Sequence, residues 1–394
     1  MDRSEDFMIR LIGVGKTYPG GTVAVRELDL DIPRGELVTL VGPSGCGKST
    51  TLKMINRLIE PTTGRIELEG EDVTHIDAVR LRRRIGYVIQ QIGLFPHQTV
   101  HTNVATIPKL LGWDRKRTNE RVDELLTTMG LEPSEFADRY PRQLSGGQQQ
   151  RVGVARALAA DPAVLLMDEP FGAVDPIVRT RLQDQFLAIQ EQLAKTVVLV
   201  THDIEEAVRL GDRVAVFERG GRLAQFDTPA RVLGGPADEF VAEFVGADRG
   251  LRRLAVTPIA ETDLEMPPIV HENDDLAEAA GRIGGQDARW AVVLDDHDNL
   301  RGWISRERAT GPGVVRDRGE RMDAWVTNEA SLKDALATML QWDAGWVAVL
   351  DGDRFLGVLT PATLHEALRR SVSAEEDGRE LADVQVSSTG PLHV

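Results

Sequence analysis

The chain has 394 residues, a formal net charge of −16 and a single cysteine, and 42% of its residues are hydrophobic. Its length predicts two or three domains, its acidic balance argues against a nucleic-acid partner, and its lone cysteine excludes an intramolecular disulfide. No apolar run approaches the roughly 18 residues that span a bilayer, and MDRSEDFMIR lacks the apolar stretch of a signal peptide. We therefore expect a cytosolic protein, or a peripheral one on the cytoplasmic face of the cell membrane.

The first candidate site is GPSGCGKST, at residues 42–50. An apolar run of strand length at 37–41 precedes it, and residues 49–58 are predicted to be helical. A strand, a glycine-rich loop and a helix in this order predict a phosphate-binding loop, where backbone N–H groups and the helix N-terminus hold the anion. Lys48 is expected to reach the β- and γ-phosphates, and Cys46 is either a small filler or a redox-sensitive thiol. The predicted nucleotide-binding residues here are Gly42, Pro43, Ser44, Gly45, Cys46, Gly47, Lys48, Ser49 and Thr50.

Four polar or glycine positions each follow an apolar run further along the chain. Gly42 follows LVTLV, Gln90 follows IGYVI, Asp168 follows VLLM and His202 follows VVLVT. Because the carboxyl ends of parallel strands share one sheet edge, we expect these positions to converge there. Asp168 suits a Mg²⁺ ligand. Glu169, one step beyond the strand end, suits a general base for the attacking water.

Three motifs occur in sequence: GPSGCGKST, then LSGGQQQR at 144–151, then VLLMDEP at 164–170. In this order they resemble the ATPase subunits of the ATP-binding cassette (ABC) family, over residues 1 to about 247. The resemblance implies hydrolysis of ATP with Mg²⁺ held by Ser49, Gln90 and Asp168. It also implies that Gln90 senses Mg²⁺ and the γ-phosphate, that His202 is the switch histidine, that Asp175 is the D-loop aspartate and that Tyr18 stacks on adenine. A surface tyrosine is the alternative for Tyr18.

LSGGQ precedes a helix-forming stretch at 152–160, so its N–H groups are expected at a helix N-terminus, which is an anion site. In the ABC family this second cradle completes the site of the partner protomer. The chain has one copy of each motif, so the resemblance implies a head-to-tail dimer, most simply with a second copy. The region 91–160 is expected to be a helical subdomain that contacts multi-span membrane subunits. The residues assigned to the second cradle are Ser145, Gly146, Gly147 and Gln148.

Composition changes after FVGADRG, at residues 244–250. The remainder from residue 248 holds 16 Lys/Arg, 27 Asp/Glu and five of the six tryptophans. Within it, 270–304 and 326–359 match at an offset of 56 residues, and each copy predicts a helix followed by two strands. A short repeated unit usually stacks on its twin to bury a shared core. The expected domains are an ATPase domain at 1–247, a linker at 248–265, repeats at 266–311 and 322–370, and an acidic, disordered tail at 371–394.

The repeat resembles a pair of CBS (cystathionine-β-synthase) motifs, which form a Bateman module. The expected fold class is therefore α/β, with a P-loop ABC-type domain of mixed sheet and helical subdomain followed by a tandem CBS module. Many such modules bind adenosine nucleotides through an aspartate, but Arg308 and Thr363 occupy the corresponding positions here. AMP or ATP binding is therefore not expected. Trp290 and Trp346 are candidates either for stacking on a base or, preferably, for core packing.

One basic segment, 301–321, lies in this acidic module. Anionic lipid could hold such a segment and release it as internal salt rises, because salt screens the attraction. Cyclic di-AMP gripped between the CBS motifs is a competing ligand, and a self-paired, solvated surface is a third interpretation. The arginines concerned are Arg301, Arg306, Arg308, Arg316, Arg318 and Arg321.

The segment VIQQIGLFPHQTVHTNVATIPKLLGW (88–113), followed by the CBS-like pair, resembles ATPase subunits of importers for quaternary-amine osmoprotectants such as glycine betaine, carnitine, choline and proline. A separate extracytoplasmic solute-binding protein would then bind the solute. Three alternatives remain at this stage. They are an importer ATPase for another small solute, a soluble ABC ATPase outside transport, and a nucleotide sensor without turnover.

Overall fold

The computed structural model of the chain describes residues 7–90, 93–172, 175–286 and 288–370. The chain forms two compact units, one of Met1–Val232 with Pro236–Gly246, the other of Leu233–Gly235 with Ala247–Val394. Within the described ranges, no helix is both long and apolar enough to cross a bilayer. The disordered tail predicted for residues 371–394 lies outside the described residues.

The first unit is built on a six-stranded sheet in the order β10-β9-β3-β8-β7-β6. All neighbours in it pair in parallel except β10, which is antiparallel to β9. Its central strands are continuous apolar runs, the pattern of strands buried on both faces. The strand bounds are β3 Leu37–Val41, β6 Ile85–Val88, β7 Val164–Asp168, β8 Thr196–Val200, β9 Arg213–Glu218 and β10 Arg222–Asp227.

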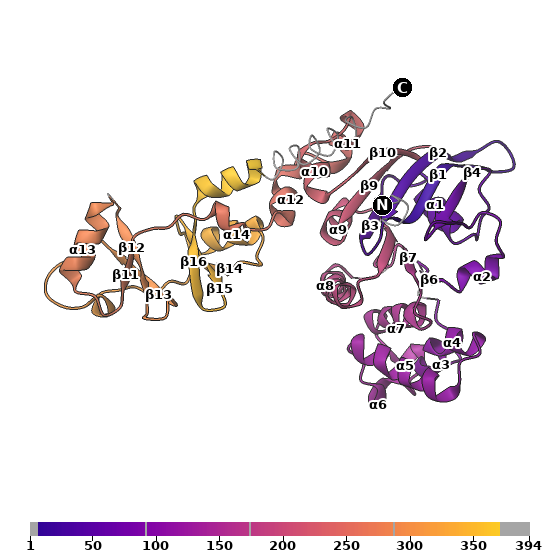
Figure 1. Cartoon of the computed structure of the whole chain (residues 1–394), viewed down its shortest axis with the longest axis horizontal. Coiled ribbons are helices and arrows are strands. Elements are labelled where there is room, and N and C mark those ends of the chain that lie inside the picture. Colours follow the sequence, from indigo (N-terminus) through magenta and orange to yellow (C-terminus); the bar gives the residue numbers. More distant parts are fainter. Residues whose placement is uncertain (1–6, 91–92, 173–174, 287, 371–394) are drawn as a thin grey trace, which may run out of the picture. The chain divides into compact units, whose positions relative to one another are not determined.

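A second, antiparallel sheet packs over one face of the first, in the order β2-β1-β4-β5 (Figure 1). Helix α1 contributes to the core between the two sheets, where Leu52 packs with Val38 and Leu40 of β3. Leu37 belongs to the core on the opposite face, as the alternation of a strand requires. The bounds of these elements are β1 Phe7–Thr17, β2 Val23–Pro33, β4 Thr63–Leu68, β5 Glu71–Asp72, α1 Lys48–Ile55 and α2 Ala78–Arg82.

Helices form the opposite core of the first unit. Figure 1 shows α3 to α7 gathered as a helical group beyond β6 and β7, with α8 beside the sheet. Helix α7 begins at Gly146, earlier than the helix-forming stretch 152–160 expected from the sequence. The placement of LSGGQ at a helix N-terminus is confirmed, because Ser145 is the N-cap of α7. The bounds are α3 Val100–Val104, α4 Thr106–Leu110, α5 Arg115–Thr128, α6 Pro133–Phe136, α7 Gly146–Leu158, α8 Pro176–Leu193, α9 Ile204–Leu210, α10 Pro229–Gly234 and α11 Glu239–Val245.

The second unit begins with α12, Arg249–Val256, and contains two copies of a strand–helix–strand–strand unit. In each copy the short first strand pairs in parallel with the second, which pairs antiparallel with the third. The sequence predicted the helix and the last two strands of each copy but missed the three-residue first strands. The copies are β11 Ile269–His271, α13 Leu276–Gly285, β12 Trp290–Leu294 and β13 Leu300–Ser305, then β14 Trp325–Thr327, α14 Leu332–Gln341, β15 Val347–Asp351 and β16 Arg354–Leu359.

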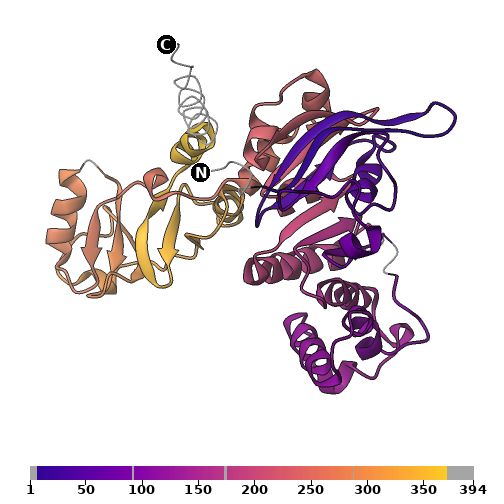
Figure 2. The same ribbon diagram turned by 45° about the vertical axis from the view of Figure 1, so that its right-hand side comes forward.

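The two small sheets of the second unit lie side by side and share a core (Figure 2). Val292 and Leu294 from β12 pack there with Ala348 and Leu350 from β15. The other face of each sheet packs on the helix of its own copy, in two further cores. Neither copy buries both faces of its sheet alone, which is why the unit is repeated.

Candidate functional site

The loop between β3 and α1 is shaped by backbone geometry that only glycine satisfies. Gly47 has φ of 105°, and a Cβ added there would lie 2.4 Å from the carbonyl oxygen of Ala24. Gly47 is also the N-cap of α1 and supplies no side chain to cap the first N–H groups of the helix. Those N–H groups and the positive end of the helix are therefore available to an anion.

Lys48 lies over this loop with its ammonium group buried. Its Nζ donates hydrogen bonds to the carbonyl oxygens of Gly42 at 2.7 Å and Pro43 at 3.1 Å, and it lies 3.4 Å from the Sγ of Cys46. Cys46 itself is fully buried, as expected of a small filler. A hollow of about 200 Å³ opens above the loop, lined by Ala24, Ser44, Gly45, Cys46, Gly47, Lys48, Ser49, Thr50 and Glu169.

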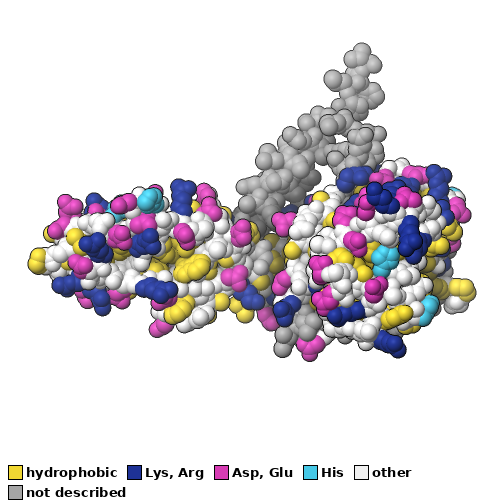
Figure 3. Space-filling model, turned by 90° about the horizontal axis from the view of Figure 1, so that it is seen from below, with side chains coloured by type: hydrophobic (Ala, Val, Ile, Leu, Met, Phe, Trp, Pro, Cys, Tyr) yellow, Lys and Arg dark blue, Asp and Glu magenta, His cyan; other side chains and the backbone are white. Residues whose placement is uncertain are grey.

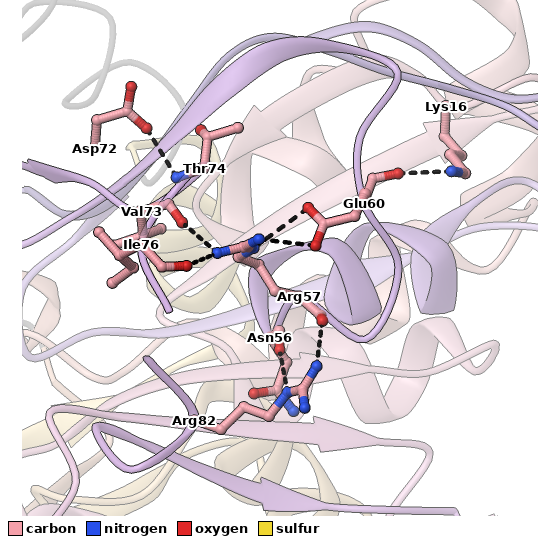
Figure 4. A network of polar contacts seen from close by, with 9 residues as sticks. All are labelled: Lys16, Asn56, Arg57, Glu60, Asp72, Val73, Thr74, Ile76 and Arg82. Atoms are coloured by element: carbon pink, nitrogen blue, oxygen red, sulfur yellow. Dashed lines mark hydrogen bonds and ion pairs between the residues drawn. The ribbon is translucent and has the colours of Figure 1, made fainter. Parts of the chain in front are cut away.

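The far end of α1 is anchored by a half-buried arginine (Figure 4). Arg57 pairs with Glu60 at 2.8 Å and also donates to the carbonyl oxygen of Ile76. Arg82 in turn donates to the carbonyl oxygens of Asn56, at 3.3 Å, and of Arg57, at 2.5 Å. These bonds satisfy carbonyls at the helix C-terminus, which otherwise have no partner. The phosphate loop is thus attached to a helix whose far end is held by these contacts.

Asp168 and Ser49 meet where β7 and α1 come together. The Ser49 hydroxyl donates to Oδ1 of Asp168 at 2.8 Å, and Asp168 is buried. Tyr87 on the neighbouring β6 is shielded from solvent, and burial, with a smaller contribution from Asp168, raises the pKa of its phenol to about 12. A hydroxyl beside a buried carboxylate is an oxygen donor set that suits Mg²⁺, which takes few protein ligands and completes its shell with phosphate and water.

Glu169 is the point at which the predicted site residues converge. Its Oε2 accepts a hydrogen bond from Nε2 of Gln90 at 3.0 Å and lies 3.4 Å from Nδ1 of His202. The backbone of Glu169 has φ of 46°, a left-handed conformation that is costly for a residue other than glycine. Strained backbone of this kind is concentrated at functional sites, and here it turns the carboxylate toward the hollow above the loop.

The sequence did not identify the residues that hold His202 and Glu169 in place. Asp203 caps α9 by accepting from the N–H of Glu205 at 2.8 Å, which fixes the turn after His202. On the other side, the buried Gln150 of α7 donates to the carbonyl oxygen of Pro170 at 2.6 Å and so ties α7 to the loop carrying Glu169. The capping pattern of an aspartate before an apolar helix could have indicated the first of these.

The second cradle lies apart from the first. Ser145 caps α7, accepting from the N–H of Gln148 at 3.3 Å, while Gln148 Oε1 accepts from the N–H of Ser145 at 2.9 Å. Gly147 is buried against Leu182, and a side chain at this position would require Leu182 to shift. Ser145 and Gly146 are exposed. None of these four residues lines the hollow at the phosphate loop of its own chain.

Two further predicted residues lie at the periphery. Tyr18 sits in the turn after β1, with the ammonium of Lys16 5.5 Å from its ring centroid, and it does not line the hollow. Asp175 is exposed at the start of α8.

In the second unit, the two tryptophans named as candidates contact each other directly. Trp290 and Trp346 stack on each other, with centroids 4.1 Å apart and rings within 6° of parallel. Arg308 pairs with Glu320 at 2.9 Å, and Thr363 exchanges hydrogen bonds with Thr360. Neither position offers a carboxylate to a ribose.

Comparisons with known proteins agree with this geometry. The ABC transporter family matches residues 25–172. The chain is 45% identical to the osmoprotectant import ATP-binding protein OsmV of Salmonella typhimurium, covering 90% of this chain and 94% of that protein. It is 42% identical to the glycine betaine/carnitine/choline transport ATP-binding protein OpuCA of Bacillus subtilis, covering 94% and 99%. A dimeric ATP-binding cassette, MJ0796, solved with ADP and phosphate, matches with a TM-score of 0.50 and 36% identity over 56% of this chain and 99% of that one.

The first unit is thus an ATP-hydrolysing P-loop domain that uses Mg²⁺, as the motifs predicted. The chain belongs to the ATP-binding subunits of ABC transporters.

Proposed function

We propose that the chain powers import of a quaternary-amine osmoprotectant, namely glycine betaine, carnitine, choline or proline, through separate membrane subunits. The substrate class is supported by the names of its relatives OsmV and OpuCA, which it matches over nearly their whole lengths. The observation that supports ATP hydrolysis as the energy source is the convergence of Gln90 and His202 on Glu169.

In this proposal the loop residues 42–50 and Lys48 bind the phosphates of ATP, exchanging the loop carbonyls for phosphate oxygens as partners of the ammonium. Ser49, Asp168 and Gln90 would hold Mg²⁺, which would neutralise the negative charge that develops on the phosphate oxygens. Glu169 orients the attacking water and accepts its proton. Gln90 and His202 fix the orientation of the Glu169 carboxylate. They also sense whether the γ-phosphate is present. Tyr18 would stack on adenine.

We further propose that the chain acts as a head-to-tail dimer of two copies. The residues of the second cradle lie at the start of α7, away from the phosphate loop of the same chain. They are Ser145, Gly146, Gly147 and Gln148. They would complete the nucleotide site of the partner, with Asp175 of the D-loop at the same interface. A relative of known structure is a dimer with ADP and phosphate bound, which supports this arrangement.

The second unit is proposed to be a regulatory CBS pair. Its basic segment 301–321 would contact either anionic lipid or cyclic di-AMP. Three of the six arginines are already paired with carboxylates: Arg301 with Asp295, Arg308 with Glu320, and Arg321 with Asp323. Acidic and basic side chains intermingle over the face drawn in Figure 3. A lipid or dinucleotide would therefore be held chiefly by Arg306, Arg316 and Arg318.

One alternative remains for the first unit, an importer of another solute. Affinity purification of the tagged chain from a detergent extract first tests its association with membrane subunits. We expect a multi-span membrane protein to co-purify in a stoichiometric amount. Recovery of the chain without any membrane protein would contradict the transport function. Uptake assays with the purified complex then identify the solute.

A further inference from the structure

Three indoles of the second unit line one hollow between its two repeats. The hollow has a volume of about 330 Å³, and Trp303, Trp342 and Trp346 form part of its wall. Trp303 belongs to the first copy and the other two to the second. Pockets that take small molecules are concave, are lined mainly by aromatic and apolar groups, and contain few polar groups. The size of this hollow is of that kind, and its lining combines the three indoles and small apolar groups with three charged residues, Arg321, Asp323 and Asp343.

The indoles are held in position by neighbours that lie outside the hollow. Trp346 is covered on one face by Trp290, at a centroid distance of 4.1 Å. Trp303 pairs with Val292 across the sheet, and its backbone exchanges two hydrogen bonds with Glu320, of 2.9 and 2.8 Å. Trp342 is the C-cap of α14 and is 50% exposed. The wall is therefore largely preformed, with one indole at its rim.

Three charged residues line the hollow, and one of them, an aspartate, has no ion-pair partner among the described residues. Asp323 pairs with Arg321 at 3.1 Å, whereas Asp343 forms no ion pair with any residue of the described ranges. Asp343 has φ of 47° directly after α14, a position that normally takes glycine or asparagine. A carboxylate kept at a strained helix end, beside three indoles, is unexplained by packing. Strain of this kind concentrates at ligand sites.

We propose that this hollow binds the quaternary ammonium group of a small solute. A methylated cation cannot donate ordinary N–H hydrogen bonds, so it is recognised by aromatic faces and a nearby carboxylate. The indoles would supply the faces and Asp343 the counter-charge. The identity of the solute rests on the import function proposed above. If that function holds, the solute is the transported quaternary amine, and the second unit detects its accumulation.

Isothermal titration of the full-length chain with choline tests the site directly. Its partner probe is 3,3-dimethyl-1-butanol, in which carbon replaces the charged nitrogen without changing the shape. Choline should bind, and the neutral analogue should bind about 5- to 30-fold more weakly, which is the contribution expected of cation–π contact. Trp342→Leu should weaken choline binding by a similar factor, whereas Trp342→Phe should retain most of it. Trp325→Leu is the matched control, because Trp325 is 48% exposed in the same unit and does not line the hollow.

Equal binding of choline and the neutral analogue would overturn the proposal, since the hollow would then be only an apolar slot. So would unchanged choline affinity in Trp342→Leu, or a Trp342-dependent affinity for AMP with none for choline. The assay contains no membrane subunits, so its outcome is independent of transport. A complex that fails to import quaternary amines while its ATPase subunit still binds choline would refute the import function and leave the site standing.

Discussion

The carboxylate of Glu169 lies 3.4 Å from the imidazole Nδ1 of His202, although the two residues are 33 positions apart in the chain. The contact follows from the parallel pairing of β7 with β8, which brings both strand ends to one edge of the sheet. Glu169 is mostly buried and His202 is largely exposed, at 22% and 58% of side-chain area. The exposed imidazole of His202 is free to move, which suits a sensor of the γ-phosphate. The carboxylate of Glu169 is held in place, which suits a general base.

Replacing Glu169 with glutamine should abolish turnover and preserve nucleotide binding. Glutamine keeps the shape of the side chain and its contact with Gln90 but cannot accept a proton from water. We expect ATP hydrolysis to fall by about 10²- to 10⁴-fold, the contribution typical of a general base. Sizing chromatography in ATP and Mg²⁺ should show a trapped dimer. Near-normal hydrolysis by Glu169→Gln would refute the role assigned to this residue.

Ser145→Arg should leave ATP binding by the isolated chain intact and abolish hydrolysis. The phosphate loop of the same chain is untouched, whereas the arginine would block the cradle offered to the partner. A mixture with Lys48→Ala chains sharpens the experiment, because each mixed dimer has one site carrying both changes and one carrying neither. We expect hydrolysis to recover in part on mixing. Weakened ATP binding by the isolated Ser145→Arg chain would show instead that LSGGQ serves its own nucleotide.

Glu206 should make the first unit less stable as the pH rises. Burial raises the pKa of this carboxyl above its ordinary value of 4.5, with Asp203 adding to the rise and Gln183, Thr201 and Arg179 opposing it. The folded state therefore binds this proton more tightly than the unfolded chain. The contribution of Glu206 to the free energy of unfolding is fully present below pH 4.5 and is lost as the pH rises through the folded-state pKa. Thermal melting of Glu206→Gln across this range should show a shallower decline. Glu205→Gln, its exposed neighbour on α9, is the control and should follow the wild type.

The basic segment of the second unit allows a test of lipid against dinucleotide. Arg316→Gln with Arg318→Gln removes two charges that pair with no carboxylate among the described residues. If lipid holds the segment, salt activation of transport in anionic proteoliposomes should flatten, because each lost arginine removes about 1 kcal/mol of attraction. Lys333→Gln with Arg354→Gln, both outside the segment, is the charge-matched control. An unchanged salt response, together with direct binding of cyclic di-AMP by the full chain, would favour the dinucleotide.

The strands and their shared edge could be predicted from the sequence, because buried parallel strands are short apolar runs and the site residues directly follow them. The start of α7 could not be placed from periodicity, since GGQQQR has no apolar stripe. The capping box formed by Ser145 and Gln148 was the available signal. The strands β11 and β14 are each three residues long, too short for a pattern of alternation. The left-handed backbone of Glu169 and the stacking of Trp290 on Trp346 depend on tertiary packing, which no local pattern encodes.

Uptake of radiolabelled glycine betaine into proteoliposomes that contain the purified complex tests the central claim most directly. ATP enclosed with the chain on the same side of the membrane should drive uptake, and the amount of ATP hydrolysed should rise in step with the solute transported. Complexes that carry Glu169→Gln should bind ATP and import nothing. Uptake that continues in Glu169→Gln, or hydrolysis in the wild type without movement of any quaternary amine, would contradict the account.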